Sequence, residues 1–311
     1  MNDTETGEPL FSKLPLMIVY ISEGLLILAG NSIAVFIFMK IRNNLRRTSY
    51  LLINLTLADL LLSVAISLYL WEGIAEMRNM PVSLKVGDTA FVSDLLASTA
   101  SPTSLSFISL ERMLAIVWPF RHRMFETWHY LASIGTLWVL TVVNVAVTNH
   151  PVFKGSFNLA TIGFSVIAFL SIKVTVASYL AIWIAIKRNQ LRNSASRSLA
   201  QHKKLAKTLC IVTTLSLITW LPAGISLAFP TYISDSHSLY SQITLALQYA
   251  NSFVNPVVYC FRMAEFQKAL KELCCRCYTK RRSLSDGTHA WVSHGISLTS
   301  FKSADSDVSR N

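Results

Sequence analysis

A lone acid inside an otherwise apolar stretch is the first residue whose chemistry stands out. Asp94 lies eighteen residues before Arg112, and Ser98, Ser101 and Leu105 follow it at intervals of four, three and four residues. This spacing predicts that the four residues share one face of a helix. At about 1.5 Å per residue, Asp94 and Arg112 would lie about 27 Å apart along that helix. A carboxylate in apolar surroundings favours a charge-assisted contact with a cation.

Other polar residues also interrupt apolar stretches of this chain. Such groups are unfavourable in a bilayer, so they are expected to face a protein interior and to mark function. Pro222 and Pro256 each remove a helix hydrogen bond and permit a kink. Each of these helices can then have two arrangements, which a switch requires. The polar residues are Asn31, Asn54, Asp59, Glu111, Trp138, Lys173, Tyr179, Trp220, Tyr249, Asn251 and Asn255.

The elements that must position these residues follow from composition. The chain of 311 residues is 52% hydrophobic and 14% charged, whereas a soluble domain has about 25% charged residues. Helices satisfy their backbone groups in lipid, so we predict an all-α integral membrane bundle of seven transmembrane helices. The third span has the weakest hydropathy. The expected spans are about 15–40, 48–72, 88–119, 128–148, 158–187, 203–229 and 238–261.

Lysine and arginine gather in alternate connections, which predicts the orientation. The N-terminus is expected to be extracellular (1–14) and the C-terminus cytoplasmic, with the bundle over 15–261. An amphipathic helix is expected over 262–277 and a disordered tail over 278–311. The net charge of +11 is thus a topology signal that suits anionic lipid and does not indicate nucleic-acid binding.

Covalent modification is predicted at both ends of the chain. Cys274, Cys275 and Cys277 follow the expected amphipathic stretch and are candidates for palmitoylation, with plain reduced thiols as the alternative. Asn2 begins an Asn-Asp-Thr glycosylation acceptor on the outer side.

Six short motifs, one in each expected helix except the fifth, resemble the rhodopsin-like (class A) G-protein-coupled receptors. They are Gly30-Asn31, Leu57-Ala58-Asp59, Glu111-Arg112-Met113, Trp138, Trp220-Leu221-Pro222 and Asn255-Pro256-Val257-Val258-Tyr259, and the resemblance covers about 15–275. It implies a plasma-membrane receptor that binds an extracellular ligand and activates a heterotrimeric G protein. Arrestin and a receptor kinase are further expected partners.

The resemblance assigns a cytosolic switch to Arg112. Arg112 would pair with Glu111 at rest and would engage Tyr179, Tyr259 and the G protein after activation, while Pro222 and Pro256 permit the helix movement. His202 stands where many relatives carry an acid, so elevated basal signalling is a further hypothesis.

The resemblance also implies a buried sodium site. Its positions are Asp59, Ser101, Asn251 and Asn255, and oxygen ligands suit a hard cation. The alternative is a hydrogen-bonded network around a protonated Asp59. No other cofactor is expected.

For the ligand, the resemblance is nearest to the biogenic-amine receptors. Asp94 would pair with a protonated amine, Tyr249 would donate to Asp94, Trp220 would form an aromatic floor, and Ser98 shares the Asp94 face.

Several positions depart from that pattern. Ala223 and Gly224 replace aromatic residues, and Gly87 stands where a disulfide cysteine is usual. Melanocortin and cannabinoid receptors, which also lack that disulfide, resemble this chain in that respect. A peptide or lipid receptor, or an orphan or non-coupling receptor, is therefore the alternative. Glu72 and Glu76 would suit a basic peptide, or are solvated loop charges.

Other membrane functions lack their usual signatures. No filter sequence indicates a channel, and no paired nucleophile and base indicates an enzyme. The seven histidines show no metal-ligand spacing.

Overall fold

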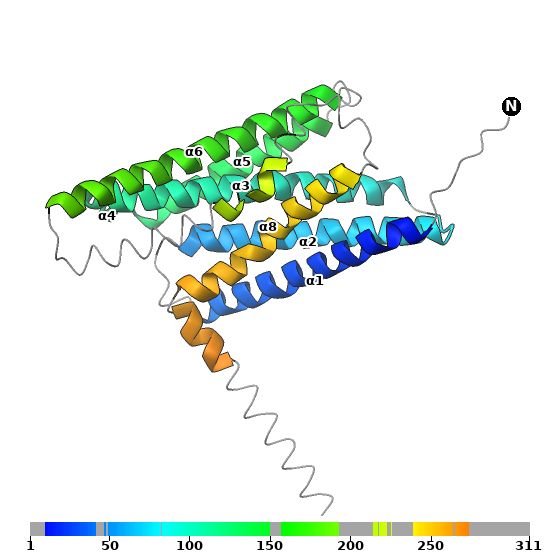
Figure 1. The fold of residues 1–311 in the computed structure, drawn as a ribbon, viewed down its shortest axis with the longest axis horizontal. Helices are drawn as coiled ribbons and strands as arrows, with labels where there is room; N and C mark the ends of the chain where they lie inside the picture. The colour runs from blue at the N-terminus through cyan, green and yellow to red at the C-terminus, as the bar shows by residue number, and fades with distance from the viewer. Residues whose placement is uncertain are drawn as a thin grey trace, which may run out of the picture. The chain divides into compact units, whose positions relative to one another are not determined.

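A computed structural model describes residues 10–41, 47, 49–81, 83–149, 157–192, 214–216, 218–222, 225, 239–263 and 265–273 (Figure 1). All regular structure in these ranges is helical, which confirms the all-α prediction. The helices are α1 (Leu10–Lys40), α2 (Ser49–Met77), α3 (Leu84–Val117), α4 (Pro119–Arg123), α5 (Thr127–Asn149), α6 (Phe157–Arg192) and α8 (Leu239–Arg262).

Four of the described helices are long and apolar enough to cross a membrane. The qualifying segments are Pro15–Lys40, Ser49–Met77, Thr127–Val147 and Val166–Arg188, and they correspond to the first, second, fourth and fifth predicted spans. Helices α3 and α8 match the third and seventh spans in position and have 34 and 24 residues, but they are more polar. Of the sixth span, only 214–216, 218–222 and 225 are described.

Helix α3 is polar because of its place in the bundle. It packs against α2, α4, α5 and α6, so much of its surface faces protein. Its hydroxyls bond to its own backbone: Thr103 Oγ1 donates to the Thr99 carbonyl and Ser104 Oγ to the Ala100 carbonyl, both at 2.7 Å. This bonding satisfies polar side chains away from water and explains the weak hydropathy of the third span.

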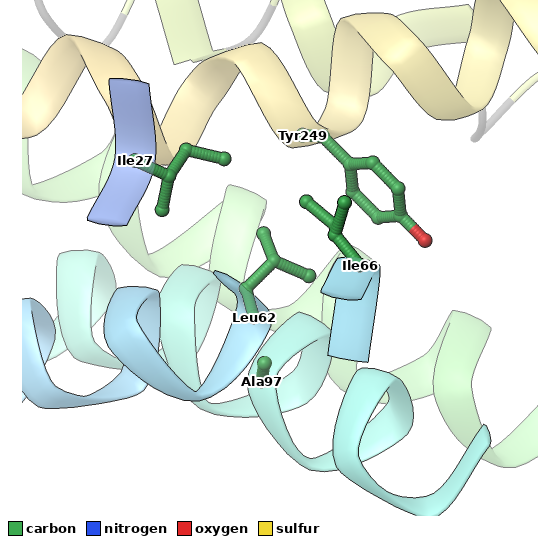
Figure 2. Close-up of a cluster of buried hydrophobic side chains, with 5 residues drawn as sticks. All are labelled: Ile27, Leu62, Ile66, Ala97 and Tyr249. Atoms are coloured by element: carbon green, nitrogen blue, oxygen red, sulfur yellow. The ribbon is translucent and has the colours of Figure 1, made fainter. Parts of the chain in front are cut away.

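A buried apolar cluster joins α1, α2, α3 and α8. Its members are Ile27, Leu62, Ile66, Ala97 and Tyr249 (Figure 2). The Tyr249 side chain extends from α8 with its hydroxyl oxygen at the end away from that helix. The cluster therefore holds a polar atom at the meeting point of four helices.

The contact between α1 and α8 explains two of the sequence motifs. A Cβ atom on Gly30 would lie 3.2 Å from Pro256 Cγ, so the missing side chain allows a close approach. Pro256 has no N–H to donate to the Ser252 carbonyl four residues earlier. Asn31 Nδ2 donates to that carbonyl instead, at 3.3 Å. An amide from α1 thus satisfies the group that the proline leaves free.

The chain divides into two compact units, Met1–Arg262 and Met263–Asn311. In the second unit, residues 265–273 are helical, within the range predicted for an amphipathic helix. The remainder of that predicted helix, 274–277, lies outside the described residues.

Candidate functional site

Asp94 lies on α3 and takes part in a short polar chain that reaches α8. Ser98 Oγ donates to Asp94 Oδ1 at 3.2 Å, as their spacing of one helical turn allows. Gln248 Nε2 of α8 donates to Ser98 Oγ at 3.1 Å. Asp94 itself is partly exposed, whereas Ser98 is buried. The carboxylate is thus anchored on one side and open to a further partner. Gln248 had no role in the sequence prediction.

Two tyrosines lie near this carboxylate, and a third packs against one of them. Tyr69 of α2 and Tyr249 of α8 both lie within electrostatic reach of Asp94. Tyr249 is 2% exposed and packs edge-on against Tyr20 of α1, with ring centroids 6.1 Å apart. The Tyr249 hydroxyl lies beside Asp94, to which it can donate, and it bonds to no other described residue. Its oxygen can still accept a hydrogen bond from a bound molecule.

Two further acids extend the negative charge toward one end of the bundle. Glu72 lies one turn from Tyr69 on α2, and its Oε1 atom lies 2.7 Å from the place where a Gly87 Cβ would be. Glu23 of α1 lies within electrostatic reach of Tyr20. Across the described ranges, neither acid nor Asp94 forms an ion pair with lysine, arginine or histidine. The site therefore combines carboxylates and phenols, and the described residues supply no cation that pairs with them.

Trp220, the predicted aromatic floor, is buried at 6% exposure in segment 218–222. The same segment approaches α8, where Tyr240 Oη donates to the Pro222 carbonyl at 3.1 Å.

Asp59, predicted to hold sodium, is fully buried on α2. Asn255 Nδ2 of α8 donates to Asp59 Oδ2 at 2.7 Å, and Ser101 Oγ of α3 donates to Asp59 Oδ1 at 3.2 Å. Ser252 contacts the same carboxylate and was not predicted. Asn251 is also buried, but its Nδ2 atom bonds to no described residue. The structure thus brings together three of the four predicted positions.

The oxygen atoms of Asp59 and Ser101 suit a hard cation, and they belong to separate helices that the ion would hold together. The unpaired atom of Asn251 is its amide nitrogen, a donor that offers no ligand to a cation, so the fit rests on the carboxylate and hydroxyl oxygens. These residues fit a small monovalent cation.

Another buried network connects α2, α3 and α5. Trp138 Nε1 donates to Asn54 Oδ1 at 2.7 Å, and Asn54 Nδ2 donates to Ser104 Oγ at 2.9 Å. Asn54 and Trp138 had been singled out in the sequence, but their pairing had not been predicted. Their separation of 84 residues explains why only the fold reveals it.

At the far end of α3, one carboxylate contacts two basic side chains. Arg112 Nε lies 3.1 Å from Glu111 Oε2, and His122 Nε2 of α4 lies 2.7 Å from Glu111 Oε1. Tyr130 Oη of α5 lies 3.3 Å from the same His122 nitrogen. The Glu111–Arg112 pair agrees with the predicted resting arrangement. His122 was not predicted from the sequence, although its place just beyond the end of α3 was an available signal.

The other predicted switch residues are distributed over α6 and α8. Tyr179 is partly buried on α6, and Tyr259 of α8 is buried, with its ring edge-on to Phe38 at 5.6 Å. His202, Asn2, Cys274, Cys275 and Cys277 lie outside the described residues.

Comparison with known proteins assigns this chain to a family. The family model for "7 transmembrane receptor (rhodopsin family)" matches residues 30–259. Somatostatin receptor type 4 of Rattus norvegicus is 23% identical over 277 residues, covering 80% of this chain and 70% of that receptor. The D(1C) dopamine receptor of Xenopus laevis is 25% identical, covering 78% and 63%, respectively. Adenosine receptor A3 of Canis lupus familiaris is 24% identical, covering 83% and 90%.

Proposed function

This chain belongs to the rhodopsin family of seven-transmembrane receptors, and we propose that it is a plasma-membrane receptor for a small protonated amine that pairs with Asp94. The family implies an extracellular ligand and a G-protein partner. The names of the similar receptors span several ligand classes. The amine assignment therefore depends on the chemistry of the site itself.

The observation that carries the amine proposal is the unpaired state of Asp94. Its carboxylate lies between α2, α3 and α8, receives one hydrogen bond from Ser98, and has no basic partner among the described residues. Tyr69 and Tyr249 flank it. A protonated amine would neutralise the acid through a charge-assisted hydrogen bond, and the phenol rings would add cation–π attraction.

Ligand binding at Asp94 would reach the cytosolic end through contacts that span the helices. The chain from Asp94 through Ser98 to Gln248 joins α3 to α8. Deeper in the bundle, Asp59 joins α2, α3 and α8 through Ser101 and Asn255. A ligand that prefers one arrangement of these helices shifts the population toward it. In the active arrangement Arg112 is released from Glu111 and receives the G protein.

Orientation and later steps complete the proposal. The N-terminus would be extracellular and the C-terminal region cytoplasmic, where receptor kinase and arrestin would act. Palmitate on Cys274, Cys275 or Cys277 would anchor the segment that follows α8.

The test is a signalling screen against a panel of biogenic amines, with Asp94→Asn beside the natural sequence. The proposal expects a response that Asp94→Asn abolishes at unchanged surface expression. Silence across the panel, or a response indifferent to Asp94→Asn, would overturn the amine assignment and favour a peptide or lipid ligand. An agonist that binds without any G-protein response would instead indicate a non-coupling receptor.

A further inference from the structure

Two carboxylates on different helices share one aromatic neighbour. Tyr69 of α2 lies within electrostatic reach of both Asp94 on α3 and Glu72 on its own helix. Tyr69 and Glu72 are three residues apart, so they lie on the same face of α2. The phenol therefore stands between two acids that belong to one surface.

Gly87 leaves room for the Glu72 carboxylate at its present position. A Cβ atom on Gly87 would be 2.7 Å from Glu72 Oε1, closer than side-chain atoms pack, so the carboxylate occupies space that only glycine leaves open. Gly87 and Asp94 are seven residues apart, which places them on one face of α3 about 10 Å apart along the helix. Glu72 and Asp94 thus mark two positions along the same wall, separated by about two helical turns.

Among the described residues, neither Asp94 nor Glu72 forms an ion pair with a basic residue. The ion pairs found within the described ranges both involve Glu111, at the other end of α3. The hydroxyl of Tyr249, which is 2% exposed, lies beside Asp94 and bonds to no other described residue. Acids grouped among helices are unfavourable unless a cation compensates them, and no described residue supplies that cation here.

We propose that the ligand carries two cationic groups about 10 Å apart, one bound at Asp94 and the second at Glu72, with Tyr69 between them. This inference rests on the proposed amine site and extends it to a second subsite between α2 and α3. The first cationic group pairs with the Asp94 carboxylate. The second pairs with the Glu72 carboxylate, and the part of the ligand between them passes the Tyr69 ring. A monoamine fills only half of this arrangement.

The experiment compares two amines with the same seven-carbon chain on the purified full-length receptor in lipid nanodiscs. Diaminoheptane supplies two ammonium groups at about the required separation, and heptylamine supplies one. Calorimetric titration is expected to show binding of diaminoheptane about tenfold or more tighter than of heptylamine, as for one additional charge-assisted contact. Glu72→Gln should remove most of this preference and leave heptylamine binding unchanged. Asp94→Asn should weaken both amines.

Two variants separate the local contact from general electrostatics. Glu76→Gln removes the same charge from an exposed position one turn further along α2 and should keep the preference. Gly87→Ala retains every charge but displaces the Glu72 carboxylate, so it should reduce the preference. Thermal unfolding midpoints of all variants identify any that fail to fold.

The outcomes separate this inference from the proposed function. Equal binding of both amines, with loss in Asp94→Asn, overturns the second subsite and leaves the Asp94 site standing. A preference that survives Glu72→Gln, or that Glu76→Gln reduces equally, also overturns it. Binding of both amines that is indifferent to Asp94→Asn overturns the proposed function itself.

Discussion

Glu111 of α3 and His122 of α4 lie 2.7 Å apart between Oε1 and Nε2, while the second oxygen of the same carboxylate lies 3.1 Å from Arg112 Nε. One acid thus contacts both the arginine that the family resemblance assigns to coupling and a histidine from the adjoining short helix. Tyr130 approaches the histidine from α5. Three helices therefore contribute to the arrangement that keeps Arg112 beside Glu111.

We predict that His122→Phe raises signalling in the absence of ligand. The substitution removes a contact that holds Glu111 beside Arg112, so the active arrangement becomes more populated. One hydrogen bond to a charged group corresponds to roughly a tenfold to hundredfold change in population. Basal second-messenger output per receptor at the cell surface measures it. His129→Phe is the control, because His129 stacks on Trp128 and Phe125; an equal rise in both variants would contradict the prediction.

Sodium should stabilise the receptor through Asp59. Sodium chloride is expected to raise the thermal unfolding midpoint of the purified protein above its value in choline chloride at equal ionic strength, because bound ligand stabilises the folded state. Asp59→Asn should abolish the difference, since the ion loses its charged ligand. This readout requires no agonist. A natural sequence insensitive to sodium would favour the alternative, a hydrogen-bonded network around protonated Asp59.

Asn54→Leu should destabilise the bundle by about 1–3 kcal/mol. The change removes both hydrogen bonds of the Asn54 amide and leaves the Trp138 indole N–H without its acceptor. Trp138→Phe removes only one of them and should have a smaller effect. Because the two residues are in contact, the double variant should lose less stability than the sum of the single variants. Thermal or denaturant unfolding in detergent measures the cycle, and strict additivity would argue against the contact.

Asn31→Leu should destabilise the receptor by about 1–3 kcal/mol through the Ser252 carbonyl, which Pro256 cannot satisfy. Adding Pro256→Ala restores a backbone N–H four residues after Ser252. The double variant is therefore expected to recover much of the stability lost in Asn31→Leu. If Pro256→Ala destabilises equally in both backgrounds, the Asn31 amide does not replace the missing helix bond.

Much of the fold was predictable from local chemistry. The apolar stretches predicted the positions of α1, α2, α5 and α6 because a bilayer requires about 20 apolar residues per span. The third span was harder to recognise, since hydropathy measures exposure to lipid and α3 packs against four other helices. Its serine and threonine hydroxyls are satisfied by its own backbone, as in the Thr103 to Thr99 bond, which no hydropathy scale records.

What the sequence by itself determined is which residues are exceptional: an acid at 94, an acid at 59, a Glu-Arg pair at 111 and 112, and prolines within helices. These stand out because polar groups and prolines are unfavourable in an apolar helix. Only the tertiary structure decided their partners. Asn255 contacts Asp59 across 196 residues and Trp138 contacts Asn54 across 84, while the Glu72 carboxylate occupies the space that Gly87 of the next helix leaves open. Such pairs depend on the packing of separate helices, and spacing along the chain carries no record of it.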